Sequence, residues 1–187
     1  FSLRIQYQQR MARKPRIEFE GALYHVVARG NRKEDIFRSK GDYERYLDLL
    51  SRYKARHHFQ LYAYVLMPNH FHAVLTQSEG KLSDVVRDMK RHTAKTVGLK
   101  LEPDGRLMWL RSFHNAAKTP DGIKLWKDEF HPEQIYSQKF FEQKVDYIHN
   151  NPVRAGYVVD PCYWKYSSAG FYYKQEPSVI DVTPIMW

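Results

Sequence analysis

The sequence contains a single cysteine, Cys162, among 187 residues. An internal disulfide is therefore impossible and a cysteine-rich zinc site cannot form, which is typical of a reducing compartment. Long apolar runs are also missing, because runs such as residues 61–67 fall far short of the ~20 residues of a membrane-spanning helix. We therefore expect a cytoplasmic protein with no membrane association, in which nine histidines remain as candidate metal ligands.

Acidic residues are outnumbered by basic ones. The chain has 30 Lys and Arg against 21 Asp and Glu, a net charge of +9, so a polyanion and above all a nucleic acid is the expected partner. It also has 14 tyrosines, 10 phenylalanines and 4 tryptophans. Aromatic faces beside basic groups suit unstacked single-stranded bases, although each ring taken alone is more often part of the core.

The length fits one domain with a core of its own, which we place at residues 11–187. Hydrophobic periodicity predicts strands at 22–29, 59–67, 69–77 and 123–131, and helices at 41–58, 81–100 and 137–151. Only a turn at Pro68 and Asn69 separates the two middle strands, which favours a hairpin. This order predicts an α+β, ferredoxin-like (RRM-like) fold, an antiparallel sheet with helices packed on one face.

Three further features of the chain are expected from local signals. Ser137 is the expected N-cap of the last helix, and Pro152 its expected end. Residues 102–122 are rich in turn formers and are expected to form a long loop with at most one short strand, whose role stays open. Residues 1–10 precede Met11, and we expect an N-terminal extension that is either disordered or foreign to the natural sequence.

His70 and His72 lie one residue apart in the third predicted strand. Side chains on a strand alternate between its faces, so both rings point to the same side and their free nitrogens can converge on one divalent cation. A pair of hydrogen-bonded structural histidines is the commoner interpretation of a bare His-x-His. A histidine-triad hydrolase would need a histidine where Val74 stands, and a two-motif phosphoesterase would need a second His-x-Ser/Thr, which the sequence lacks.

The last predicted helix carries Tyr147 and Asn151 four residues apart, on a face that Lys144 borders. Phe141, Val145 and Ile148 form the separate apolar stripe of this helix. A tyrosine off the core stripe, one turn from an amide that can offer its carbonyl to a metal, is compatible with a catalytic site. A surface tyrosine and a helix-ending asparagine are the competing interpretation.

The stretches MPNHFH (67–72) and YIHNNPVRAGYV (147–158) closely resemble the single-tyrosine HUH transposases and, within them, the REP-associated tyrosine transposases of the IS200-like type. ALYHVVARGNRKEDIF and YWKYSSAGFYY also resemble this family, so the resemblance covers roughly residues 11–173. It implies a ferredoxin-like sheet, a metal-binding pair at His70 and His72, a nucleophile at Tyr147 and a third ligand at Asn151.

The resemblance implies a metal-dependent transposase that cuts and rejoins single-stranded or hairpin DNA through a 5′-phosphotyrosine, without a nucleotide cofactor. The expected ion is Mg²⁺ or Mn²⁺, because two imidazoles and an amide oxygen form a site of intermediate softness. Such a protein would act at the nucleoid. Basic side chains expected to contact DNA are Arg87, Lys90, Arg91 and Lys95 on the polar face of one helix, and Lys144 on another.

Two alternatives stay open. A ferredoxin-like sheet with exposed aromatics is also a binding platform for single-stranded nucleic acids without catalysis. A replication initiator or relaxase shares the histidine pair but comes with larger partner domains, for which this chain has no room. Whether the chain is a monomer or a homodimer is left undetermined.

Overall fold

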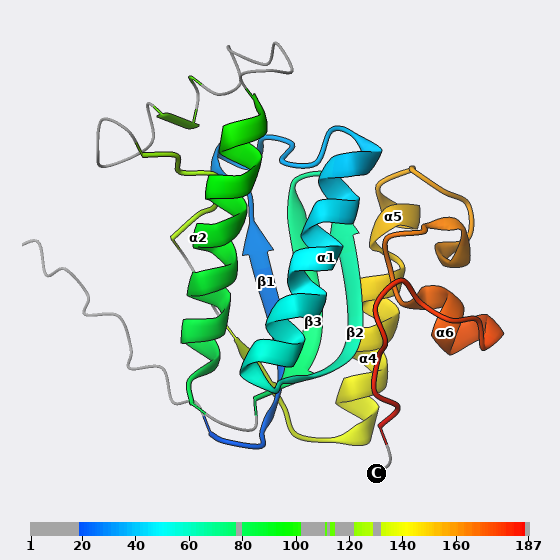
Figure 1. Ribbon diagram of the computed structural model, residues 1–187. Helices are drawn as coiled ribbons and strands as arrows, with labels where there is room; N and C mark the ends of the chain where they lie inside the picture. Colours follow the sequence, from blue (N-terminus) through cyan, green and yellow to red (C-terminus); the bar gives the residue numbers. More distant parts are fainter. Residues whose placement is uncertain are drawn as a thin grey trace, which may run out of the picture.

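The computed structural model of the chain describes residues 19–77, 80–101, 111, 113–114, 122–128 and 132–185. A four-stranded antiparallel sheet in the order β2-β3-β1-β4 forms its centre (Figure 1). The strands are β1 (Leu23–Arg29), β2 (Gln60–Met67), β3 (His70–Thr76) and β4 (Glu133–Ile135). This order and the antiparallel pairing confirm the predicted ferredoxin-like α+β class, including the tight hairpin between β2 and β3.

Two long helices, α1 (Lys40–His57) and α2 (Leu82–Leu101), cover one face of the sheet, as Figure 1 shows. Their apolar stripes bury Leu47 and Leu50 of α1 and Val85 and Met89 of α2 in the same core as Phe71 of β3. Both stripes recur at three- and four-residue spacing, so each helix has one face that must leave water. These two helices form the layer that is predicted on one face of the sheet.

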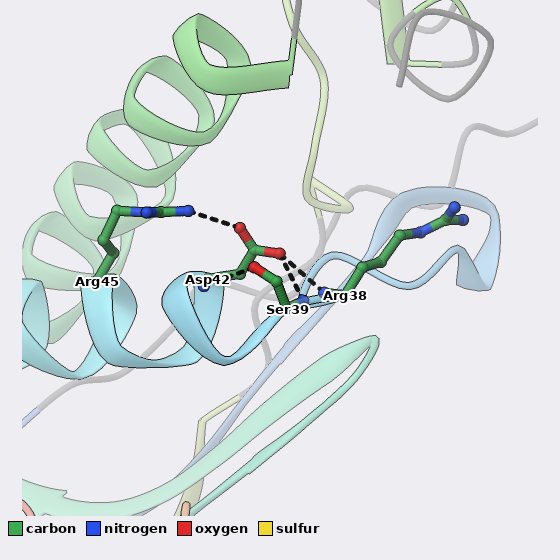
Figure 2. Close-up of polar contacts among 4 residues, drawn as sticks. All are labelled: Arg38, Ser39, Asp42 and Arg45. Carbon is green, nitrogen blue, oxygen red and sulfur yellow. Dashed lines mark hydrogen bonds and ion pairs between the residues drawn. The ribbon is translucent and has the colours of Figure 1, made fainter. Parts of the chain in front are cut away.

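The first turn of α1 is closed by a capping box (Figure 2). Ser39 Oγ accepts a hydrogen bond from the backbone N–H of Asp42 at 3.3 Å, and the Asp42 carboxylate accepts one from the N–H of Ser39 at 2.9 Å. The same carboxylate accepts from the N–H of Arg38 and pairs with Arg45 Nη2 at 2.9 Å, so a nearly buried charge keeps its partners. A cap of this kind stabilises a helix by about 1 kcal/mol.

A second layer covers the opposite face of the sheet, where α4 (Gln138–His149) packs. Val145 and Ile148 of α4 form a core with Val65 of β2 and Val74 of β3. Ser137 is the N-cap, as predicted, because its Oγ accepts a hydrogen bond from the N–H of Phe140. The remaining elements are η1 (Asn31–Lys33), α5 (Asn151–Arg154), η2 (Pro161–Tyr163) and α6 (Ala169–Lys174).

The predicted position of the fourth strand is wrong. Within residues 122–128 only Trp126 forms a bridge, to Gly30, whereas β4 at 133–135 pairs with the start of β1. Both segments therefore follow the same edge of β1. Pro132 stands immediately before β4 and has no N–H to offer a neighbouring strand, which favours a strand that begins only after it.

Some predictions fall on parts of the chain outside the described residues: the N-terminal extension 1–10 and most of the loop 102–122. Among the helices that are described, none combines the length and the apolar character needed to cross a membrane.

Candidate active site

The histidine pair lies at the start of β3, on the sheet face that α4 covers. His70 stands opposite Arg29 of β1 and His72 opposite Val27. The two rings are 4.9 Å apart between centroids and nearly perpendicular, and His72 is only 1% exposed. The period of two along the strand thus brings both imidazoles to one place, as predicted.

The ring nitrogens of the pair have different partners. His72 Nδ1 is 3.0 Å from His25 Nε2, while His72 Nε2 is buried and has no hydrogen-bond partner in the described part of the chain. His70 Nδ1 is 2.6 Å from Asn69 Oδ1. A buried polar nitrogen without a partner costs roughly 1–3 kcal/mol, so a ligand at His72 Nε2 would remove a penalty that an ordinary core avoids.

Both imidazoles are held neutral. Burial lowers the pKa of His70 to about 4, and the charge of Arg29 acts in the same direction. Burial holds the pKa of His72 well below its usual range, and the positive charge of a protonated His70 would act in the same direction. A neutral imidazole keeps a lone pair on one nitrogen, which is the form that binds metal ions.

Tyr147 of α4 lies against His72. Its ring is 5.8 Å from that of His72 between centroids, at 78°, and its side chain is 37% exposed. Asn151, one turn later, donates from Nδ2 to the carbonyl oxygens of Tyr147 at 2.8 Å and of Ile148 at 3.3 Å. The Asn151 side chain is also a hydrogen-bonding neighbour of His70, which raises the pKa of that histidine against the effect of burial.

These residues suit a divalent cation only as a mixed donor set. In the described ranges, no group of three or more His, Cys, Asp or Glu side chains is arranged to hold a metal ion. The candidate ligands are instead the two neighbouring neutral imidazoles, one with the partnerless Nε2 of His72, and the side chain of Asn151 beside His70. Nitrogen and amide oxygen together form a set that Mn²⁺ and Mg²⁺ both accept.

Two cations approach the Tyr147 ring. Arg154 stacks on it, with Cζ 4.6 Å from the ring centroid, and its Nη2 lies 3.4 Å from the tyrosine carbonyl oxygen. Lys144, the cation that the sequence analysis selected, is 6.0 Å from the same ring and forms an ion pair with Glu133 at 2.6 Å. The guanidinium is therefore the closer positive charge at this tyrosine.

Sequence reasoning missed three residues of this site: His25, Glu133 and Arg154. His25 shares a strand face with Leu23 and Val27, but only the pairing of β1 with β3 brings that face to His72. Glu133 lies on β4, and the sequence predicts this strand at other residues. Arg154 is close because α5 continues past Pro152, which occupies the first turn of a helix, where its missing N–H costs nothing. The sequence predicts the end of the helix at Pro152, whereas α5 follows α4 directly and contains Pro152.

The basic side chains of α2 are not part of this cluster. Arg87, Lys90, Arg91 and Lys95, which we call the α2 basic face, belong to the helix that covers the other side of the sheet. The first three border a groove of about 530 Å³ against residues 122–128, which add Lys124 and Lys127. Arg87 is paired with Asp84 at 2.6 Å.

The chain is similar to known proteins in both sequence and fold. Residues 18–151, most of the chain, match the family Transposase IS200 like. The REP-associated tyrosine transposase of Escherichia coli K12 is 24% identical over 150 residues, which cover 79% of this chain and 76% of the relative. A solved REP-associated tyrosine transposase bound to a REP hairpin has the same fold, with a TM-score of 0.64, 20% identity and coverage of 94% and 95%. The resemblance seen in the sequence is confirmed: the chain belongs to the IS200-like transposase family.

Proposed function

We propose that the protein cuts and rejoins single-stranded DNA at hairpin-type repeats, with Tyr147 as the nucleophile. The observation that carries this proposal is the position of the Tyr147 ring, which lies against His72 of the histidine pair and has the Arg154 guanidinium stacked on it. Membership in a family of DNA-processing transposases supports it, and a structurally similar member binds a REP hairpin.

In the proposed reaction the Tyr147 oxygen attacks the phosphorus of a DNA phosphodiester. A bond forms between this oxygen and the phosphorus, the bond to the 3′ oxygen breaks, and a 5′-phosphotyrosine and a free 3′-OH result. The new ester retains the energy of the old one, so a second 3′-OH can attack it and rejoin a strand without a nucleotide cofactor. The phenolic proton passes to water, which reaches the partly exposed side chain, and the leaving 3′ oxygen takes up a proton from water.

Arg154 supplies a positive charge directly over the Tyr147 ring. A guanidinium stacked on a tyrosine ring is attracted to the ring, and more strongly once its oxygen carries a negative charge. The same cation is placed to contact a phosphate that approaches Tyr147. Lys144 reaches the site less directly, because Glu133 shares its charge.

A divalent ion, Mg²⁺ or Mn²⁺, would be held by His70, His72 and Asn151. When bound, it would neutralise charge that develops on the phosphate oxygens. The contribution of the chain is to keep both imidazoles neutral by burial and to fix Asn151 through the two carbonyls that its Nδ2 contacts. Nitrogen ligands favour Mn²⁺ over Mg²⁺ in affinity, so both ions should support activity, Mn²⁺ at lower concentration.

The α2 basic face would hold the DNA backbone outside the reacting site. The groove that it borders carries five cations, Arg87, Lys90, Arg91, Lys124 and Lys127, against the single carboxylate of Asp128. Residues of the same segment, 122–128, also pair with the end of β1 beside Arg29. A single DNA strand bound in the groove would therefore reach the face of the sheet that carries the active site by passing around this edge.

The test is a covalent adduct between protein and DNA on a denaturing gel. The protein is incubated with labelled single-stranded hairpins and Mn²⁺, and Tyr147→Phe is compared with Tyr157→Phe, a control at a tyrosine that is 51% exposed. We expect Tyr147→Phe to abolish the adduct while hairpin binding and thermal stability stay near those of the control. A 5′-linked adduct with Tyr147→Phe would show that another residue is the nucleophile.

A further inference from the structure

His25, a residue without a role in the proposed reaction, is joined to His72 inside the protein. It lies on β1, 5% exposed, and its ring is nearly parallel to that of His72, with centroids 5.2 Å apart and planes at 7°. Its Nε2 is 3.0 Å from His72 Nδ1, and its Nδ1 is 3.6 Å from Glu133 Oε2. Glu133 in turn pairs with Lys144 at 2.6 Å.

The positions of the protons in this chain of contacts follow from the far nitrogen of His72. A hydrogen bond between two neutral imidazoles has one donor and one acceptor. If His72 Nε2 is to offer a lone pair, the single ring proton must sit on Nδ1, so His25 Nε2 must accept it. The proton of His25 is then on its Nδ1, which faces the Glu133 carboxylate.

We propose that His25 is a positioning residue, which accepts the Nδ1 proton of His72 and so fixes the tautomer and the ring orientation that expose His72 Nε2 to a cation. Glu133, held by Lys144, fixes the tautomer of His25 in the same way. The part that concerns the cation rests on the proposed function, whereas the tautomer does not.

A purely structural role explains the network less well. Its polar chain runs from the half-exposed Glu133 through His25 and His72 to a buried nitrogen that has no partner. In a polar network that only stabilises a core, every polar group has a hydrogen-bond partner, because a buried polar group without one is costly. The neighbours of His25 on the same strand face, Leu23 and Val27, show that apolar side chains fit there. Outer partners that orient a metal-binding histidine are, in contrast, a general feature of metal sites.

Nitrogen-15 NMR of the histidine rings in the metal-free full chain tests the tautomer. With the protein dialysed against a chelator, we expect both His25 and His72 to carry their proton on Nδ1. His25→Phe keeps an aromatic ring but removes the acceptor, so His72 should shift toward the Nε2–H form. His57→Phe is the matched control, because that ring stacks on Tyr53 of α1, on the other side of the sheet.

Mn²⁺ affinity, measured by calorimetry without DNA, is the second readout. His25→Phe should weaken binding about 10- to 100-fold, the usual effect of losing an outer partner of a metal ligand. His25→Gln should recover most of the affinity, because its amide oxygen can accept the proton from His72 at about the position of the lost Nε2. Urea unfolding of each variant shows whether it is folded at the temperature of the assay.

The two proposals fail in different ways. If the unmutated chain binds no Mn²⁺, the cation part of the proposed function fails and the tautomers alone decide the role of His25. An Nε2–H tautomer of His72 in the unmutated chain would overturn the positioning role. So would a His25→Phe variant with unchanged tautomer and unchanged Mn²⁺ affinity.

Discussion

His149 should make the protein lose stability as the pH falls below neutrality. The residue is completely buried on α4, with Nε2 2.8 Å from Ser168 Oγ, and its Nδ1 has no partner among the described groups. Burial lowers the pKa of His149 from 6.5 to about 4, against the opposing charge of Asp146. The imidazole is therefore neutral in the folded protein, while the unfolded chain takes up a proton near pH 6.5.

The sign and size follow from proton linkage. Between pH 6.5 and 4 the unfolded chain binds more protons at this residue, so stability is fully present above pH 6.5 and is lost as the pH falls toward 4. The whole shift corresponds to about 3 kcal/mol, and the part between pH 7.5 and 5.5 to about 1.3 kcal/mol. His149→Gln, whose amide can still bond Ser168, should remove this part of the pH dependence.

Urea unfolding at pH 5.5, 6.5 and 7.5, in chelator to exclude metal binding, measures the effect. The difference in unfolding free energy between pH 7.5 and 5.5 should be smaller in His149→Gln than in the unmutated chain by about 1.3 kcal/mol. His92→Gln, at an exposed position of α2, is the control for a histidine substitution as such. An identical pH dependence in His149→Gln and the unmutated chain would refute the reasoning.

Three further predictions concern the active site and the DNA. Arg154→Gln should slow single-turnover cleavage about 10-fold, whereas Arg154→Lys should slow it less, because a cation over a tyrosine ring is worth roughly 1–2 kcal/mol; equal rates for Gln and unmutated protein would contradict this. Asn151→Ala should raise the Mn²⁺ concentration needed for half-maximal cleavage while leaving the maximal rate nearly unchanged, since water can replace a neutral oxygen ligand; complete loss at saturating Mn²⁺ would argue for another role. The double change Arg91→Gln and Lys95→Gln should reduce the slope of log affinity against log salt for single-stranded DNA by about 1.4, or about 0.7 per charge, and an unchanged slope would place the strand elsewhere.

The sequence predicted best those side-chain positions that depend only on the repeat of a single strand or helix. The alternation along a strand places His70 and His72 together, and the helical repeat places Tyr147 and Asn151 one turn apart. The structure bears out both relations, because each depends on a few bonds of one element. The turn at Pro68 is equally local, and it set the register of β2 against β3.

Relations between distant segments could not be read in this way. His25 meets His72 only through the pairing of β1 with β3, across 47 positions of the chain. The sequence likewise did not show that α4 would cover the face opposite α1 and α2, although this choice is what brings Tyr147 to the histidines. Proline signals were ambiguous for a physical reason: Pro152 is as acceptable in the first turn of a new helix as after the end of an old one.

The two faces of the sheet differ in a way that explains where the chemistry lies. The face under α1 and α2 is filled largely by aliphatic and aromatic side chains, which stabilise the fold at any pH. The face under α4 carries three histidines, His25, His70 and His72, where apolar side chains could pack. Burial lowers their pKa values, so they stabilise the fold less in acid. Apolar residues would make that core more stable, and this cost supports the proposal that His70 and His72 bind a cation, with His25 positioning His72.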